Sequence, residues 1–189
     1  MSRSHLGLIL LVLTIAVQVS GQANDQQEKR IALVIGNGNY IGSTLANPEN
    51  DAHSMADVLK KLGFTVYEYE NLSQSRIKEV IDDFGQKLKV NKVGLFYYAG
   101  HGIQAKGFNY LIPVDAQLKT EEQVEYDCVR ADRVLALMET SGTRINIIIL
   151  DACRNNPFNR FPDFFASFHF NCLCACFFHN PDGRIKCNF

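Results

Sequence analysis

A cysteine and a histidine able to do chemistry each follow closely on an apolar run. Cys153 comes after Ile145–Leu150, and His101 comes after Val93–Ala99 and sits between two glycines. An imidazole beside a thiol raises the reactive thiolate fraction and returns the proton to a leaving amine. The pair therefore has the chemistry of a nucleophile and a general base in acyl transfer. Taken singly, each residue also suits a structural role, so the elements around them must decide.

The chain between residues 30 and 153 alternates apolar runs with segments of helical periodicity. Runs typical of buried strands are Ile31–Ile35, Phe64–Glu70, Val93–Ala99 and Ile145–Leu150. Helices are predicted from Asn47, from Ser73 and over Arg130–Glu139, with the first two residues as N-caps. A hairpin is predicted at Ile103–Pro113. This order predicts an α/β fold, an open, mostly parallel sheet flanked by helices on both faces.

His101 and Cys153 then lie at the same edge of that sheet. In open parallel sheets, sites form beyond the carboxyl ends of the strands, near the point where the strand order reverses. His101 follows the third strand, and Cys153 follows the fourth, 52 residues later. Their common edge favours a catalytic dyad over two unrelated structural residues.

Four blocks of the sequence share the pattern of one known family. They are Arg30–Asn37 (RIALVIGN), Leu45–Ala52 (LANPENDA), Tyr97–Gly102 (YYAGHG) and Leu150–Pro157 (LDACRNNP). A histidine about 50 residues before the cysteine is a caspase signature. The chain thus resembles the caspase-like cysteine peptidases, the caspases and metacaspases, and is most similar to their bacterial metacaspase-like members, the orthocaspases. The resemblance covers Arg30 to Phe158.

The resemblance implies a cysteine-type endopeptidase that acts on protein or peptide substrates, with no cofactor and no metal. Carried over to matching positions, it makes Cys153 the nucleophile and His101 the base, and the N–H groups of Gly102 and Cys153 bind the oxyanion. Metacaspases place two acids in the first specificity pocket, which match Asp51 and Asp151 here. Such a pocket implies cleavage after Arg or Lys. From the residues alone, Asp51 also suits a first-turn helix acid and Asp151 a loop-capping residue.

The sequence departs from the family after residue 160. The small-subunit half, which adds strands beyond the fourth, has no match in the Phe- and Cys-rich tail 161–189. The predicted sheet is therefore truncated, and Ile145–Leu150 becomes an exposed apolar edge that favours self-association. We expect this outcome rather than a return of the tail onto the edge, because Pro157 and Pro162 interrupt an immediate strand. The missing half leaves open a second interpretation, a caspase-fold pseudo-peptidase that binds or regulates without turnover.

The N-terminal segment predicts export. Arg3 precedes the apolar run Leu6–Val19, and small residues follow it, so residues 1–21 are interpreted as a signal peptide. Residues 22–29 then form a flexible lead-in to a catalytic domain over residues 30–160. At 14 residues, the apolar run is shorter than the ~20 needed to span a bilayer. We therefore expect a secreted or periplasmic protein without stable membrane insertion after cleavage.

Charge and two further motifs bear on other classes of protein. With 19 basic and 20 acidic residues and no basic cluster, the chain lacks the footprint of a nucleic-acid binder. A nucleotide-binding module is an alternative, since Gly36-x-Gly38 follows the first strand, but Ile41 occupies the third glycine position.

The tail also holds a run of alternating cysteines near two histidines, namely Cys172, Cys174, Cys176, His169 and His179. Their spacing differs from that of structural zinc sites, so no metal site is predicted.

Overall fold

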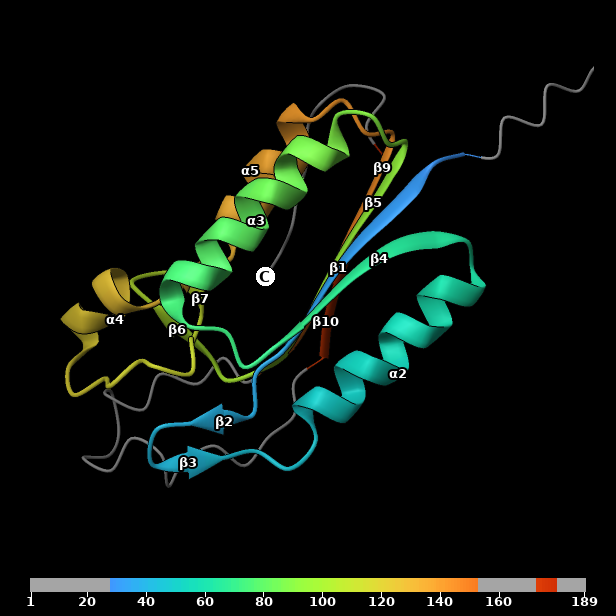
Figure 1. Ribbon diagram of the computed structural model, residues 1–189. Helices are drawn as coiled ribbons and strands as arrows, with labels where there is room; N and C mark the ends of the chain where they lie inside the picture. The colour runs from blue at the N-terminus through green and yellow to red at the C-terminus, as the bar shows by residue number, and fades with distance from the viewer. Residues whose placement is uncertain (1–27, 153–172, 180–189) are drawn as a thin grey trace, which may run out of the picture.

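The computed structural model describes residues 28–152 and the backbone of residues 173–179 (Figure 1). Its elements in chain order are β1 (Arg30–Gly36), β2 (Asn39–Tyr40), β3 (Ser43–Thr44), α2 (Pro48–Lys61), β4 (Phe64–Glu70), α3 (Gln74–Leu88), β5 (Val93–Gly100), β6 (Gly102–Ala105), β7 (Phe108–Leu111), α4 (Glu121–Asp127), β8 (Val129–Arg130), α5 (Asp132–Thr140), β9 (Ile145–Ala152) and β10 (Leu173–His179). The four strands predicted from apolar runs are β1, β4, β5 and β9.

Five strands form the central sheet in the order β10-β9-β5-β1-β4. Strands β4, β1, β5 and β9 run parallel, and β10 runs antiparallel to β9. The chain steps from β1 out to β4 and then returns to β5 on the other side of β1, so the strand order reverses between β1 and β5. This confirms the predicted open, mostly parallel sheet, and its reversal point is where sites form in such sheets.

Helices cover both faces of this sheet, α2 on one face and α3 with α5 on the other (Figure 1). Because side chains alternate along a strand, Ala32 and Val34 of β1 belong to the core under α2. Ile31, Leu33 and Ile35 belong to the core under α3 and α5. A strand buried on both faces needs apolar residues at every position, which explains the continuous runs in the sequence. Of the helices in the described part of the chain, none is long and apolar enough to cross a membrane.

The predicted N-caps are in place, but their side chains do not cap. Asn47 and Ser73 occupy the N-cap positions of α2 and α3, and neither side chain makes a capping hydrogen bond. Helix α2 still begins at Pro48, whose missing N–H suits the first turn. Glu49 and Asp51 in that turn lie near the positive end of the helix dipole. The start of α2 therefore depends on the proline and the acids rather than on a side-chain cap.

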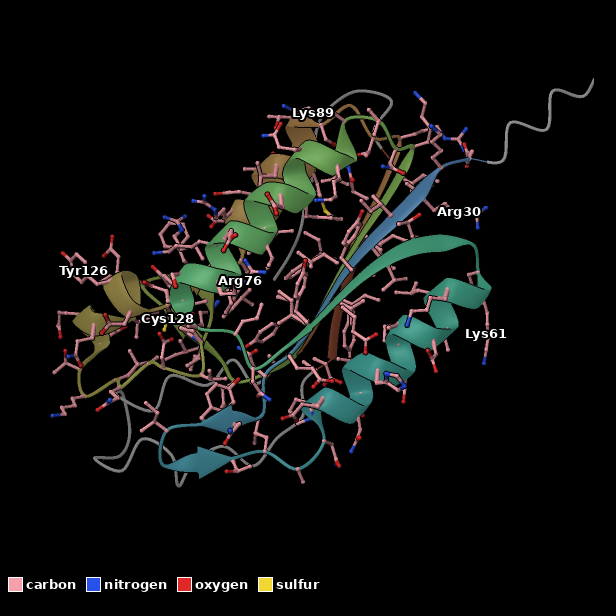
Figure 2. The ribbon with its side chains drawn as sticks, viewed as in Figure 1. Arg30, Lys61, Arg76, Lys89, Tyr126 and Cys128 are labelled. Atoms are coloured by element: carbon pink, nitrogen blue, oxygen red, sulfur yellow. The ribbon has the colours of Figure 1, made fainter. Side chains whose placement is uncertain are left out.

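A second sheet, of β6, β7 and β8, follows β5 in the chain. Strands β6 and β7 form the predicted hairpin, joined at Lys106–Gly107. Strand β8 and helix α4 were not predicted. Because β8 pairs Arg130 with Tyr110, helix α5 begins at Asp132 and not at Arg130. This part has its own core, to which Cys128, labelled in Figure 2, belongs. Cys128 is 3% exposed.

The structure corrects the expectation for the edge of the sheet. Strand β10 pairs with β9 along its whole length, from Leu173 opposite Asp151 to His179 opposite Ile145. The prediction that Ile145–Leu150 forms an exposed edge is therefore wrong, and the self-association expected from it loses its basis. The prolines at 157 and 162 do not prevent the return strand, because β10 begins well beyond them.

The glycines after β1 have a structural explanation that does not involve a nucleotide. A Cβ atom at Gly36 would lie 2.5 Å from the Pro48 carbonyl oxygen, and a Cβ atom at Gly38 would collide with the Glu49 carboxylate. Both glycines therefore let the first turn of α2 approach the end of β1. A carboxylate over Gly38 would also repel a phosphate, which disfavours the nucleotide-binding alternative.

Candidate active site

The carboxyl ends of β5 and β9 lie side by side. The two strands are parallel neighbours in register, and their last pair is Gly100 opposite Ala152. His101 is the next residue after Gly100, and Cys153 is the next residue after Ala152. Neighbouring strands lie about 4.8 Å apart. Cys153 itself lies outside the described residues, but the residues immediately before the predicted dyad are direct partners in the sheet.

His101 is buried beside Tyr40, a residue to which the sequence analysis assigns no role in the site. Its side chain is 2% exposed, and its ring centroid lies 4.5 Å from that of Tyr40, at an interplanar angle of 47°. Burial lowers the pKa of His101 from 6.5 to about 4, because the charged imidazolium would lose its hydration. The imidazole is therefore neutral near pH 7, which is the form that can accept a proton.

The main chain of His101 is held by two buried tyrosine hydroxyls. Its N–H donates to the Tyr40 hydroxyl at 2.7 Å, and its carbonyl accepts from the Tyr98 hydroxyl at 2.9 Å. Gly100 has φ +152°, and a Cβ atom there would lie 2.6 Å from the Tyr40 oxygen and 2.9 Å from the Tyr98 oxygen. A side chain at position 100 would thus push both hydroxyls away from the histidine backbone.

Asn37 ties the neighbouring loops to this site. It is completely buried, its N–H donates to the Ala99 carbonyl, and its amide oxygen accepts the Leu72 N–H at 2.9 Å. Its amide nitrogen lies 3.4 Å from the carbonyls of Leu72 and Ile112. Sequence reasoning missed Asn37 and Tyr40; the available signal was a polar residue and an aromatic directly after a buried strand.

Gly102, the predicted oxyanion donor, lies beside the end of β9. It lines a small cavity together with Leu150 and Ala152 of that strand, and with residues of the β6–β7 hairpin. Gly102 is paired with Leu111 in the hairpin. The predicted donor and the residue preceding Cys153 therefore border one space.

The two predicted pocket acids lie near a common tyrosine. The Tyr97 hydroxyl donates to the Asp151 carboxylate at 3.3 Å. Burial raises the pKa of Tyr97, and the negative charges of Asp151 and Asp51 raise it further. Asp51 is exposed in the first turn of α2, whereas Asp151 is half-buried at the end of β9. Asp151 thus contacts the Tyr97 hydroxyl directly, and Asp51 acts on the same hydroxyl through its charge.

No group of three or more possible metal ligands occurs among the residues that the structure describes. In the tail, His169 and Cys172 lie outside the described residues, and only the backbone is described for Cys174, Cys176 and His179.

Comparison with known proteins matches one family over most of the chain. The family described as the caspase domain matches residues 29–186, which includes most of the tail that sequence reasoning left unassigned. The human protein named mucosa-associated lymphoid tissue lymphoma translocation protein 1 is 32% identical over 136 residues, which are 70% of this chain and 16% of that protein. Its mouse homologue is 32% identical over 126 residues, 66% of this chain and 15% of that protein. The chain thus spans about a sixth of these relatives.

A solved structure shares the fold. The crystal structure of protein GSU0716 from Geobacter sulfurreducens superposes with a TM-score of 0.51 at 23% identity. The match covers 66% of this chain and 50% of that chain. At this identity, the likeness supports the architecture and carries no statement about activity.

Proposed function

Because this chain belongs to the caspase-domain family, we propose that it is a cysteine-type endopeptidase with a dyad of Cys153 and His101. The observation that carries the proposal is the pairing of Gly100 with Ala152 at the ends of β5 and β9. Each of these residues directly precedes one member of the dyad. Two reactive groups that follow neighbouring ends of parallel strands are favourably placed to share a proton.

The proposed mechanism assigns each group one step. The neutral His101 imidazole takes the thiol proton, and the Cys153 thiolate attacks the scissile carbonyl carbon. The N–H groups of Gly102 and Cys153 bind the oxyanion that forms. His101 then gives its proton to the leaving amine, and the acyl-enzyme is hydrolysed by a water that His101 deprotonates.

The dyad is tested by two substitutions and one label. Cys153→Ala is expected to abolish cleavage of a fluorogenic peptide panel, and His101→Ala to lower the rate by about 10²- to 10⁴-fold, the usual contribution of a general base. Iodoacetamide is expected to label Cys153 first, as found by peptide mass spectrometry. Cys128→Ala is the matched control, because this thiol is buried and burial raises its pKa to about 12.

The same experiment separates the two interpretations of the fold. Full activity in either dyad variant would contradict the mechanism. An unreactive Cys153 with no turnover of any peptide would instead favour a binding or regulatory module on the caspase fold.

For substrate choice, we propose cleavage after Arg or Lys. The Tyr97 hydroxyl donates to Asp151, and the charges of Asp151 and Asp51 both raise the pKa of Tyr97, which supports a common acidic pocket formed by α2 and β9. A carboxylate pair of this kind binds a guanidinium or ammonium group through charge-assisted hydrogen bonds.

We predict that the peptide panel shows turnover after Arg and Lys and almost none after Asp. Asp151→Asn is expected to raise KM for an Arg substrate by about 10- to 100-fold, the range for one hydrogen bond to a charged group. Asp57→Asn is the control, because Asp57 lies on α2 but pairs with the exposed Lys60. Preferred cleavage after Asp would overturn the acidic pocket.

A further inference from the structure

Two tyrosine hydroxyls lie against the peptide group next to the proposed oxyanion site. Tyr98 is completely buried and Tyr40 is 4% exposed, and their oxygens lie 3.2 Å apart. The Tyr40 oxygen accepts the His101 N–H. The Tyr98 oxygen lies 2.9 Å from the carbonyl oxygens of both His101 and Ile112. Burial raises the pKa of both hydroxyls, so they stay protonated at any working pH.

The acceptor of each tyrosine hydroxyl proton can be assigned from its neighbours. Carbonyl oxygens only accept, so the single Tyr98 proton is assigned to the carbonyls of His101 and Ile112, which share it. Tyr40, which accepts from the His101 N–H, then directs its own proton to the Tyr98 oxygen. The resulting chain runs from the His101 N–H through Tyr40 and Tyr98 to the His101 carbonyl. Hydrogen bonds arranged in this way polarise one another.

The His101 carbonyl shares a peptide plane with the Gly102 N–H. A trans peptide is planar, with its C=O and N–H pointing in opposite directions. The carbonyl accepts two hydrogen bonds, from Tyr98 and from the Ile112 N–H at 3.0 Å. These two bonds therefore also set the direction of the Gly102 N–H.

The hairpin ladder shows which way this N–H points. Gly102 and Leu111 lie opposite each other, and the Ile112 N–H donates to the His101 carbonyl, one residue beyond each of them. A ladder bond in this position means that Gly102 and Leu111 form a non-hydrogen-bonded pair. In such a pair, the N–H groups point away from the opposite strand. The Gly102 N–H thus points away from β7. Gly102 also borders the cavity that residues of β6 and β7 line together with Leu150 and Ala152, and Ala152 directly precedes Cys153.

We propose that Tyr98, supported by Tyr40, is a positioning residue that holds the His101–Gly102 peptide so that the Gly102 N–H meets the oxyanion. The proposal rests on the proposed endopeptidase function and adds to it a residue that acts through the peptide plane. Oxyanion donors stabilise the transition state when their direction is set before the reaction begins.

The two carbonyl groups that face the Tyr98 hydroxyl also have other hydrogen-bond donors. The His101 carbonyl keeps the Ile112 N–H as a donor without it. The Ile112 carbonyl keeps the Asn37 amide nitrogen at 3.4 Å. A phenylalanine at position 98 would therefore leave both carbonyls with a partner, but the peptide plane would have one restraint fewer.

The experiment compares Tyr98→Phe and Tyr40→Phe with Tyr67→Phe in the full chain. Tyr67 is the matched control, because it is half-buried on β4, two strands away from β5. For Tyr98→Phe we expect kcat to fall by about 10- to 100-fold. This is less than the roughly 10²- to 10³-fold loss of kcat that follows complete removal of an oxyanion donor, because the Gly102 N–H is still present. KM is expected to change by less than about twofold, because the substrate is bound before the oxyanion forms. Tyr40→Phe is expected to show a smaller loss of the same kind, and it also serves if Tyr98→Phe does not fold.

Two inhibitors separate positioning from a general loss of structure. A peptide aldehyde forms a tetrahedral adduct with the thiol, so its affinity is expected to fall in proportion to kcat. Alkylation of Cys153 by iodoacetamide forms no oxyanion, so its rate is expected to stay the same. Unchanged kcat in folded Tyr98→Phe, or equal losses in kcat and alkylation rate, would overturn the role of Tyr98. An inactive wild-type chain with an unreactive Cys153 would instead overturn the proposed function itself.

Discussion

At the scale of single residues, burial decides how His101 titrates. Its pKa falls from 6.5 to about 4 in the folded chain, because a charged imidazolium there would be poorly hydrated. Between these two pH values, the unfolded chain binds a proton at this residue and the folded chain does not. His101 therefore leaves stability unchanged above pH 6.5. As the pH falls from 6.5 to 4, it lowers the free energy of unfolding by about 3 kcal/mol in total.

This titration can be followed in Cys153→Ala, where no thiolate can act on the imidazole. We predict that His101 titrates near pH 4 in this variant by NMR, well below its value in the urea-unfolded chain. A pKa at or above 6.5 in the folded variant would show that burial does not control the residue. A higher pKa in the wild type than in Cys153→Ala would measure the attraction between thiolate and imidazolium.

At the scale of elements, β10 protects the most apolar edge of the sheet. It covers β9, whose sequence INIIILDA has no lysine or proline to hinder pairing with another chain. Loss of β10 would return β9 to the aggregation-prone state expected for an uncovered strand.

Two neighbouring substitutions test this protection. Successive N–H groups of a strand point to opposite sides, so of Ala175 and Cys176 only one directs its N–H to β9. We predict that proline at that one position removes a ladder bond and causes concentration-dependent association, measured by light scattering. Proline at the other position is the internal control and is expected to have a smaller effect. Two equally monomeric variants would contradict the protective role.

At the scale of the whole molecule, every described element lies after the predicted signal peptide. Strand β1 begins at Arg30, so cleavage after residue 21 leaves all described elements intact. We propose that the chain is exported, since Leu6–Val19 follows a basic residue and precedes small ones. Cleavage would remove Arg3 and leave 18 basic against 20 acidic residues, a net charge of −2.

Export is tested by N-terminal sequencing of the chain recovered outside the cytoplasm. We predict a first residue at or shortly after Gln22. Leu11→Arg, which places a charge inside the apolar run, is expected to leave the chain in the cytoplasm with Met1 intact. Ser4→Arg adds the same charge before the run and is the control, because a basic start favours a signal peptide. Recovery of wild-type chain with Met1 from the cytoplasm alone would contradict export.

The sequence alone was enough to predict the parallel core and the neighbouring carboxyl ends of β5 and β9, which His101 and Cys153 follow in the chain. These depend on local patterns: apolar runs such as Val93–Ala99 form strands, and the chain order of strands and helices restricts the topology to few choices. The start of α2 at Pro48 is likewise a local matter, because proline suits only the first turn.

Only the tertiary structure showed β10 on β9 and the tyrosines around His101. Pairing of β10 joins Leu173 to Asp151 across a long connection, and no local pattern specifies that partner. Tyr40 and Tyr98 are separated by 58 residues, and their hydroxyls meet because Gly100 leaves space and burial excludes water. A hydroxyl shows its role only through its partners, and those partners are set by folding rather than by neighbours in the chain.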